Sequence, residues 1–241
     1  MAGNVRVFQR EYEMIKKIVQ RVRFLKRINI FQFLHLNYFC ESIVRTDQSK
    51  LIPYKNAVID IAPGARIYIG GGDIEIGCDL LRKSKAETRL RLRERAVWSI
   101  YGGCKISYGS TVEILKDAVF DCKYFTMNSN STVIVAEKII FGKDVMIGRN
   151  VVVYDSDHHQ IIDEQGKIAN RPAPVVIGDH VWLATNVLVL KGVTIGEGSV
   201  VGANSTVNKR VGSHMIFSSE HRSHIKENGG KWDRMSPSVE R

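Results

Sequence analysis

Aliphatic residues recur at every sixth position in the C-terminal half of the chain, and this period restricts the possible fold more than any other feature. The series is Ile177, Leu183, Val189, Ile195, Val201 and Val207. An α-helix, with about 3.6 residues per turn, would spread these positions around its whole surface, and a flat strand would show a period of two. A parallel β-solenoid fits, because each six-residue unit forms one short face with its aliphatic residue inside.

The same phase is present earlier in the chain, at Val135, Phe141, Ile147 and Val153. Residues 155–174 are too polar to continue the wall, so we expect them to form a loop extruded from the solenoid. Farther upstream the pattern weakens, and a break in phase between Phe120 and Val135 predicts an irregular coil around residues 123–131. The basic stretch at about residues 78–95 is expected to form a second loop insertion.

The first part of the chain does not follow the repeat. Ile15, Ile18, Val22 and Leu25 have helical spacing with lysines and arginines between them, which predicts an amphipathic helix. We interpret it as a cap on the open end of the solenoid, with attachment to an anionic membrane surface as the alternative. The expected domains are an N-terminal helical cap region (1–50), a β-helix (51–212) and a C-terminal tail (213–241).

Charge and cysteine usage restrict the partners and the compartment. The 241 residues carry a formal net charge of +10, which favours anionic partners. The basic stretches lack interleaved aromatic residues, so nucleic acid is not expected. The four cysteines are widely spaced, as in a chain with reduced thiols, and we expect neither a secretory signal nor a membrane span. The prediction is a cytoplasmic protein, with contact at the inner face of the membrane as the alternative.

The extruded loop begins with the sequence DSDHH, residues 155–159. Imidazole is the side chain best suited to proton transfer near neutral pH, which makes His158 and His159 candidates for chemistry. In a polar loop alone, both histidines are also compatible with simple solvation.

The segment IGDHVWLATNVLVLKGVTIGEGSVVGANSTVNK, residues 177–209, together with the DSDHH loop, resembles the hexapeptide-repeat acyltransferases. The closest pattern is that of galactoside and maltose acetyltransferases and of capsular polysaccharide O-acetyltransferases. The resemblance implies an all-β fold, a left-handed parallel β-helix with an extruded catalytic loop. It further implies acetyl-CoA as co-substrate, no metal, and a homotrimer with active sites between subunits.

The resemblance also implies roles for single residues. The tract from the catalytic histidine of the family to its IG dipeptide matches residues 158–177 without a gap, which assigns catalysis to His158. Acceptor binding falls on Asn128, Asp157 and His159. Cofactor binding falls on Trp182, Ala184, Thr185, Ala203, Asn208 and Lys209. Two departures are Asn204, where the family often has glycine, and residues 218–232, which replace a conserved type of terminal turn.

The predicted reaction is acetyl transfer to a hydroxyl of a cell-surface polysaccharide, of capsule or lipopolysaccharide, or of its sugar precursor. His158 would act as general base, with backbone N–H groups stabilising the oxyanion. Asp155, Asp157, Asp163 and Glu164 are candidates for orienting the imidazole, and Lys191 and Lys209 for meeting coenzyme A phosphates.

Three alternatives use the same fold. An N-acetyltransferase acting on an amino sugar of a nucleotide-linked sugar would need the same base. A zinc β-helix of the γ-carbonic anhydrase type would need three converging histidines, of which His158 and His180 are two candidates. A non-enzymatic scaffold would need no such loop. Trp182 and Asn128 also have structural interpretations, as a wall-packing aromatic and a turn residue.

Overall fold

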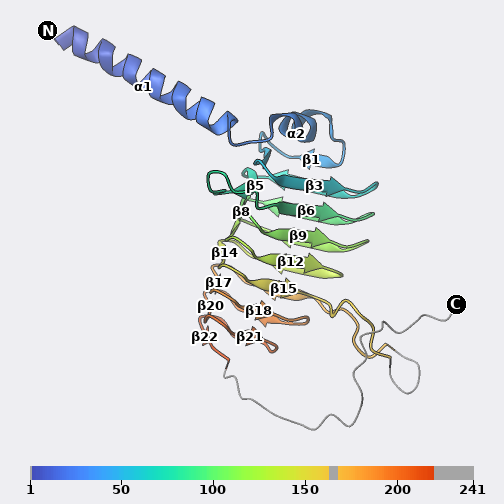
Figure 1. Ribbon diagram of the computed structural model, residues 1–241. Coiled ribbons are helices and arrows are strands. Elements are labelled where there is room, and N and C mark those ends of the chain that lie inside the picture. The colour runs from blue at the N-terminus through green and yellow to red at the C-terminus, as the bar shows by residue number, and fades with distance from the viewer. Residues whose placement is uncertain (1, 163–167, 220–241) are drawn as a thin grey trace.

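The computed structural model describes residues 2–162 and 168–219 of the chain. The strands of this part pair in parallel and form three sheets around a common axis, so that one circuit of the chain contributes one strand to each sheet. Figure 1 shows the circuits stacked one above another along the axis. The predicted left-handed parallel β-helix is confirmed.

The first sheet consists of β1 (Ile43–Arg45), β4 (Arg66–Gly70), β7 (Val97–Tyr101), β10 (Val119–Cys122), β13 (Lys138–Phe141), β16 (Val175–Ile177) and β19 (Thr194–Ile195). The second consists of β2 (Leu51–Pro53), β5 (Ile74–Cys78), β8 (Cys104–Ser107), β11 (Phe125–Met127), β14 (Val145–Ile147), β17 (Trp182–Leu183), β20 (Val200–Val201) and β22 (Ile216–Phe217). The third consists of β3 (Ala57–Ile61), β6 (Thr88–Leu92), β9 (Thr111–Ile114), β12 (Thr132–Val135), β15 (Val152–Tyr154), β18 (Leu188–Val189) and β21 (Thr206–Val207).

The six-residue period places the aliphatic residues inside, as predicted. In the late coils the register advances by eighteen residues, three hexads per circuit, so Ile177 pairs with Ile195 and Val189 with Val207. All members of both aliphatic series are buried. The irregular coil predicted around residues 123–131 is wrong. The segment forms the regular strand β11, which pairs in parallel with β14. Val119 pairs with Lys138, nineteen residues on, and Phe125 with Val145, twenty residues on, so this circuit is one to two residues longer than the late ones and the six-residue phase is broken.

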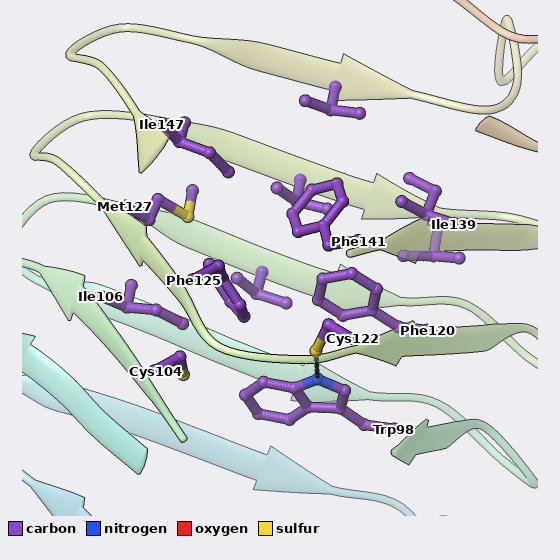
Figure 2. Packing of buried hydrophobic residues seen from close by; sticks show 14 of the residues in the cluster. Trp98, Cys104, Ile106, Phe120, Cys122, Phe125, Met127, Ile139, Phe141 and Ile147 are labelled. Atoms are coloured by element: carbon purple, nitrogen blue, oxygen red, sulfur yellow. Dashed lines mark hydrogen bonds between the residues drawn. The ribbon is translucent and has the colours of Figure 1, made fainter. Parts of the chain in front are cut away.

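Large aromatic side chains fill the middle of the core. Trp98 and Phe120 stack with ring centroids 5.9 Å apart, and Phe120 meets Phe141 edge to face at 5.1 Å. Figure 2 shows these rings with Phe125, and the indole N–H of Trp98 donating to the sulfur of Cys122 at 3.1 Å. Because the coils are longer here, the interior is wide enough for aromatic rings, whereas the late coils are filled by valine, leucine and isoleucine.

The solenoid is longer than the predicted range of 51–212. Strand β1 lies before that range and pairs with β4, while β22 lies after it and pairs with β20. The insertion predicted at residues 78–95 is also shorter, because Thr88–Leu92 form strand β6 between β3 and β9. Alternating Arg89 and Arg91 point outward there, so the basic composition reflects a solvated strand face rather than a loop.

The helical region differs from the predicted cap. Helix α1 (Ala2–Leu25) extends away from the solenoid in Figure 1, and its described side chains, from Tyr12 onward, are exposed. The open end is covered instead by α2 (Ile30–Leu34) and the π-helical turn η1 (His35–Phe39), which contributes Leu36 to the core. The amphipathic pattern of α1 predicted that the helix has an apolar face, but it did not identify the surface that this face packs against. The assignment of the cap to α1 is wrong. None of the helices in the described ranges has the length and apolar character needed to cross a bilayer.

Candidate functional site

A groove of about 580 Å³ runs along the corner where the chain passes from the second sheet to the third. We call this edge the groove corner. Five residues predicted for binding line it, namely Asn128, Trp182, Ala184, Thr185 and Ala203. They come from successive coils, after β11, on and after β17, and after β20. Asn128 and Ala203, 75 positions apart, are thus brought together by the stacking of coils rather than by proximity in sequence.

Small residues and left-handed turns keep this corner narrow. A Cβ added at Gly148 would lie 2.8 Å from the carbonyl carbon of Ala184 on the next coil, so the coil spacing leaves no room for a side chain there. Asn150, Asn186 and Asn204 have φ values of 54°, 60° and 58°, a region that asparagine tolerates better than most residues.

These asparagines also form a ladder between coils. Asn150 donates from Nδ2 to Oδ1 of Asn186 at 3.1 Å, and Asn186 donates from Nδ2 to Oδ1 of Asn204 at 2.9 Å. At Asn204, where the resemblance implies glycine, the asparagine keeps the left-handed turn and adds a hydrogen bond between coils.

The outer face of the second sheet beside the groove is apolar. Met146 pairs with Trp182, Trp182 with Val200, and Val200 with Ile216, so these four side chains form one column along the wall. Trp182 is 45% exposed and Ile216 84% exposed. Trp182 points outward and lies between Met146 and Val200 in this column, so its two interpretations, as a wall-packing aromatic and as a binding residue, both stay predictions.

Met146, Gly148 and Arg149 also line the groove and were missed from the sequence. The repeat carried a signal for them. Arg149 follows Gly148 on one coil as Thr185 follows Ala184 on the next, so the phase of the hexads places both in the same corner.

His158 and His159 lie on the extruded loop at a different corner, where the chain passes from the third sheet to the first. We call this edge the loop corner. In Figure 1 the loop leaves β15 on the side opposite the labels of β14, β17 and β20. The His158 ring is exposed and contacts the ring of Tyr154 edge to face, with centroids 4.9 Å apart. Its backbone has φ of 62°, and its N–H donates to Oγ of Ser156 at 3.0 Å.

Asp157, Asn170 and Lys191 hold the base of the loop. Nζ of Lys191 lies 2.5 Å from Oδ2 of Asp157 and 3.1 Å from the carbonyl oxygen of Asn170. Nδ2 of Asn170 donates to Oδ2 of Asp157 at 2.9 Å and to the carbonyl oxygen of His159 at 2.8 Å. Hydrogen bonds from Lys191 and Asn170 lower the pKa of Asp157 below its usual value. This network fixes the backbone on both sides of His158.

Asp155 is fully buried and has a structural role. Oδ1 accepts from the N–H of Ala136 at 2.7 Å, and Oδ2 accepts from the N–H groups of Glu137 at 2.8 Å and Lys138 at 2.7 Å. Both oxygens are therefore occupied by the neighbouring turn, and Asp155 is unsuited to orienting His158. The other two candidates, Asp163 and Glu164, lie outside the described residues.

The remaining predicted residues lie at the loop corner or are otherwise engaged. Asn208 and Lys209 follow β21 and are exposed, with Nζ of Lys209 5.9 Å from the ring centre of Phe217. Lys191 is engaged by Asp157 and Asn170, so its assignment to a coenzyme phosphate is not supported. Most of the replaced terminal turn at 218–232 lies outside the described residues.

The histidines of the zinc alternative do not meet. His180 lies in the turn between the first and second sheets, where Nδ1 is 2.7 Å from Oδ2 of Asp144, whereas His158 lies at the loop corner. Over residues 2–162 and 168–219, no group of three or more His, Cys, Asp or Glu side chains is arranged to hold a metal ion.

The described cysteines are free thiols, and burial raises the pKa of Cys78 to about 12.

The late coils of this chain are similar to those of known proteins. Residues 174–209 match the family model described as bacterial transferase hexapeptide (six repeats). Galactoside O-acetyltransferase of Escherichia coli is 31% identical over 112 residues, covering 46% of this chain and 51% of that protein. Polysialic acid O-acetyltransferase of Neisseria meningitidis is 34% identical over 87 residues, covering 35% and 40%.

The chain thus spans about half the length, or less, of these curated relatives. Among solved structures, the polysialic acid O-acetyltransferase OatWY aligns with a TM-score of 0.47 at 18% identity, covering 76% of this chain and 93% of that one. The repeat, the extruded loop and the match over residues 174–209 lead to one conclusion: the chain is similar to the hexapeptide-repeat acetyltransferases.

Proposed function

We propose that this protein transfers the acetyl group of acetyl-CoA to a hydroxyl of a cell-surface polysaccharide, of capsule or lipopolysaccharide, or of its sugar precursor. The observation that carries the proposal is the groove, which gathers five of the predicted binding residues from successive coils at one corner. Relatives named galactoside and polysialic acid O-acetyltransferases support a sugar hydroxyl as acceptor.

His158 is the general base of this proposal. Its imidazole takes the proton of the acceptor hydroxyl while that oxygen forms a bond to the thioester carbonyl carbon. The carbon–sulfur bond then breaks, and the imidazolium returns the proton to the departing coenzyme A thiolate. The exposed ring and the hydrogen-bonded loop base suit this role, because the ring can reach a substrate while its backbone is held.

The site is divided between two chains. The base lies at the loop corner and the groove lies at the groove corner, so we propose that the loop of one copy covers the groove of the next. A closed ring of three equivalent copies satisfies this arrangement for every loop and every groove. The apolar column of Met146, Trp182, Val200 and Ile216 supports packing between copies, because an exposed apolar stripe of this kind marks an interaction surface.

Within this site, acetyl-CoA would lie along the groove, against Trp182, Ala184, Thr185 and Ala203. Arg149 lines the same groove and offers a charge for a phosphate. Asn208 and Lys209 would meet the coenzyme from the loop corner of the neighbouring copy. We assign acceptor contacts to Asn128 and His159, while Asp157 holds the loop through Lys191. The reaction belongs in the cytoplasm, where free thiols stay reduced.

The test is release of coenzyme A thiol from acetyl-CoA with a panel of oligosaccharides and amino sugars. His158→Ala should lower acceptor-dependent release by at least about 100-fold. The control His214→Ala, which removes an exposed imidazole outside both the groove and the loop, should retain most of it, and light scattering should give the same mass for all three proteins.

Three results would contradict parts of the proposal. Release that His158→Ala leaves unchanged would remove His158 as the base. Release with amino sugars alone would replace hydroxyl transfer by N-acetylation. Failure of acetyl-CoA to bind in calorimetry, with the full chain folded, would leave a scaffold as the function.

A further inference from the structure

A second concave region lies at the other end of the molecule, where α1 meets the first coil. This junction pocket has a volume of about 940 Å³ and is formed by the end of α1, the turn between β2 and β3, and the loop between β5 and β6. Six of its lining residues are cationic: Arg23, Lys26, Arg27, Lys55, Arg82 and Lys83. No aspartate or glutamate lines it.

The junction pocket is tied together by contacts between its segments. The N–H of Lys55 donates to the carbonyl oxygen of Arg27 at 2.9 Å, and Nδ2 of Asn56 donates to the carbonyl oxygen of Ser84 at 3.2 Å. The rings of Phe24 and Tyr54 meet edge to face at 6.4 Å. The cations are therefore held around one hollow rather than spread along a free helix.

The six cations lack the acidic partners that other cations of this protein have. Within the described ranges none of the six forms an ion pair. The arginines of the neighbouring strand and the turn after it are paired: Arg89 with Glu87, Arg91 with Asp60, Arg93 with Glu113 and Arg95 with Asp117. Converging cations that have no acidic partner among the described residues indicate an external anion.

An apolar hollow of about 570 Å³ adjoins the junction pocket, and the two share Lys26, Lys55 and Asn56. Its apolar lining comes from Val22, Leu25, Ile28, Ile30 and Phe31. Phe31 is 88% exposed at its rim, and Leu81, from the junction pocket, is 65% exposed. Large apolar side chains this exposed beside clustered cations are typical of surfaces that enter the headgroup region of a bilayer.

We propose that this end of the protein binds an anionic phospholipid bilayer, with a lipid phosphate in the junction pocket and the adjoining acyl region against the apolar hollow. The shared residues Lys26 and Lys55 lie at the boundary, where a phospholipid changes from charged to apolar. A soluble polyanion would use the cations but would leave Val22, Leu25 and Phe31 without a partner. The proposal is independent of acetyl transfer, because neither pocket shares a residue with the groove.

The test is co-sedimentation of the full chain with vesicles made of equal parts phosphatidylglycerol and phosphatidylcholine, compared with pure phosphatidylcholine. We expect binding to the anionic vesicles, weak binding to the neutral ones, and a steep loss of binding as salt approaches about 0.5 M. Lys55→Glu should weaken binding roughly tenfold or more, because it removes one attraction and adds one repulsion.

The matched control is Lys116→Glu, which makes the same change of charge at an exposed turn between β9 and β10. It should alter binding by about twofold or less. Arg82→Glu provides a second variant of the pocket should Lys55→Glu fail to fold, as judged by circular dichroism. Phe31→Ser should weaken binding to anionic vesicles without a change of charge.

Three results would overturn the proposal. Equal binding to both kinds of vesicle, or no binding to either, would exclude an anionic lipid as the ligand of this pocket. Equal effects of Lys55→Glu and Lys116→Glu would show that net charge and not the pocket is responsible. Full binding by Phe31→Ser, with displacement by polysialic acid, would assign the cations to a soluble polyanion.

Discussion

Nζ of Lys191 lies 2.5 Å from Oδ2 of Asp157, and this contact joins the base of the extruded loop to the next coil of the wall. Both residues act on His158 through the backbone and do not touch the proposed reacting atoms. Lys191→Met should therefore lower kcat/KM roughly tenfold, because a small displacement of a base is costly in rate. The melting temperature should stay close to that of the native protein, and Lys191→Arg should restore most of the activity. Steady-state kinetics and thermal melts check both; a fall in melting temperature matching the loss of activity would contradict the positioning role.

The same contact predicts a response of the loop to acid. The folded-state pKa of Asp157 is lowered, mainly by the hydrogen bonds from Lys191 and Asn170, so the carboxylate favours the ordered loop above the unfolded pKa of about 3.9. That contribution is lost as the pH falls through the lower folded value. The protection factors of the amides at His159 and Asn170, which compare exchange with the intrinsic rate at each pH, should fall below about pH 4 in the native protein. Asp157→Asn should show lower protection factors at neutral pH and little further loss in acid.

Asp155 should matter for stability rather than for catalysis. Three backbone N–H groups donate to its carboxylate. Asparagine would place an amide donor opposite at least one of these donors, and alanine would leave all three without an acceptor. We expect a loss of about 2–4 kcal/mol in the free energy of unfolding for Asp155→Ala, measured with denaturant. Asp117→Asn, which alters an exposed carboxylate paired with Arg95, serves as the control and should leave the midpoint nearly unchanged. A normal midpoint for Asp155→Ala would show that water replaces the carboxylate.

The asparagine ladder at the groove corner allows a comparison between two substitutions at one site. Asn186→Gly removes the side-chain hydrogen bonds but keeps an easy left-handed turn, whereas Asn186→Ala removes the bonds and strains the backbone at φ of 60°. The alanine variant should be less stable than the glycine variant by about 1 kcal/mol. Equal stabilities would mean that the turn relaxes in the alanine variant, which a crystal structure would show.

The divided site predicts complementation between two inactive proteins. His158→Ala lacks the base, and Ala203→Trp fills the groove, so each alone should be inactive. In a ring assembled at random from equal amounts, about a quarter of the sites should pair an intact loop with an intact groove. Mixing after dissociation should therefore restore about a quarter of the native rate. Recovery without dissociation and exchange of chains would contradict this arrangement, as would no recovery when mass measurements show that chains have mixed.

The six-residue period predicted the fold because only a β-solenoid places every sixth side chain in the interior. Ile177 and Val189 had to lie inside a solenoid, and both do. Ala184 and Ala203 were grouped by the family resemblance and not by the period, and both line the groove. The period breaks down where one or two extra residues in a circuit shift the phase, as in the coil that contains Phe125.

Features that depend on a partner were harder to predict. A carboxylate after a strand looks the same in sequence whether it faces a loop or a turn, so Asp155 was grouped with the candidates near His158. Periodicity also gave α1 an apolar face without indicating what meets it, while the short turn that buries Leu36 has too few residues to show a period. Lys191 looked like a phosphate ligand because its acidic partner lies 34 positions away.

The two ends of the extruded loop are already joined, since the N–H of Ala173 donates to the carbonyl oxygen of Asp155 at 2.9 Å. The wall therefore closes without any contribution from the residues between them. Such a segment is free to lengthen, shorten or be exchanged during evolution while the coils remain intact. A common scaffold can in this way acquire new acceptor preferences by replacing one interchangeable part, and grafting this loop onto a related solenoid would be the engineering equivalent.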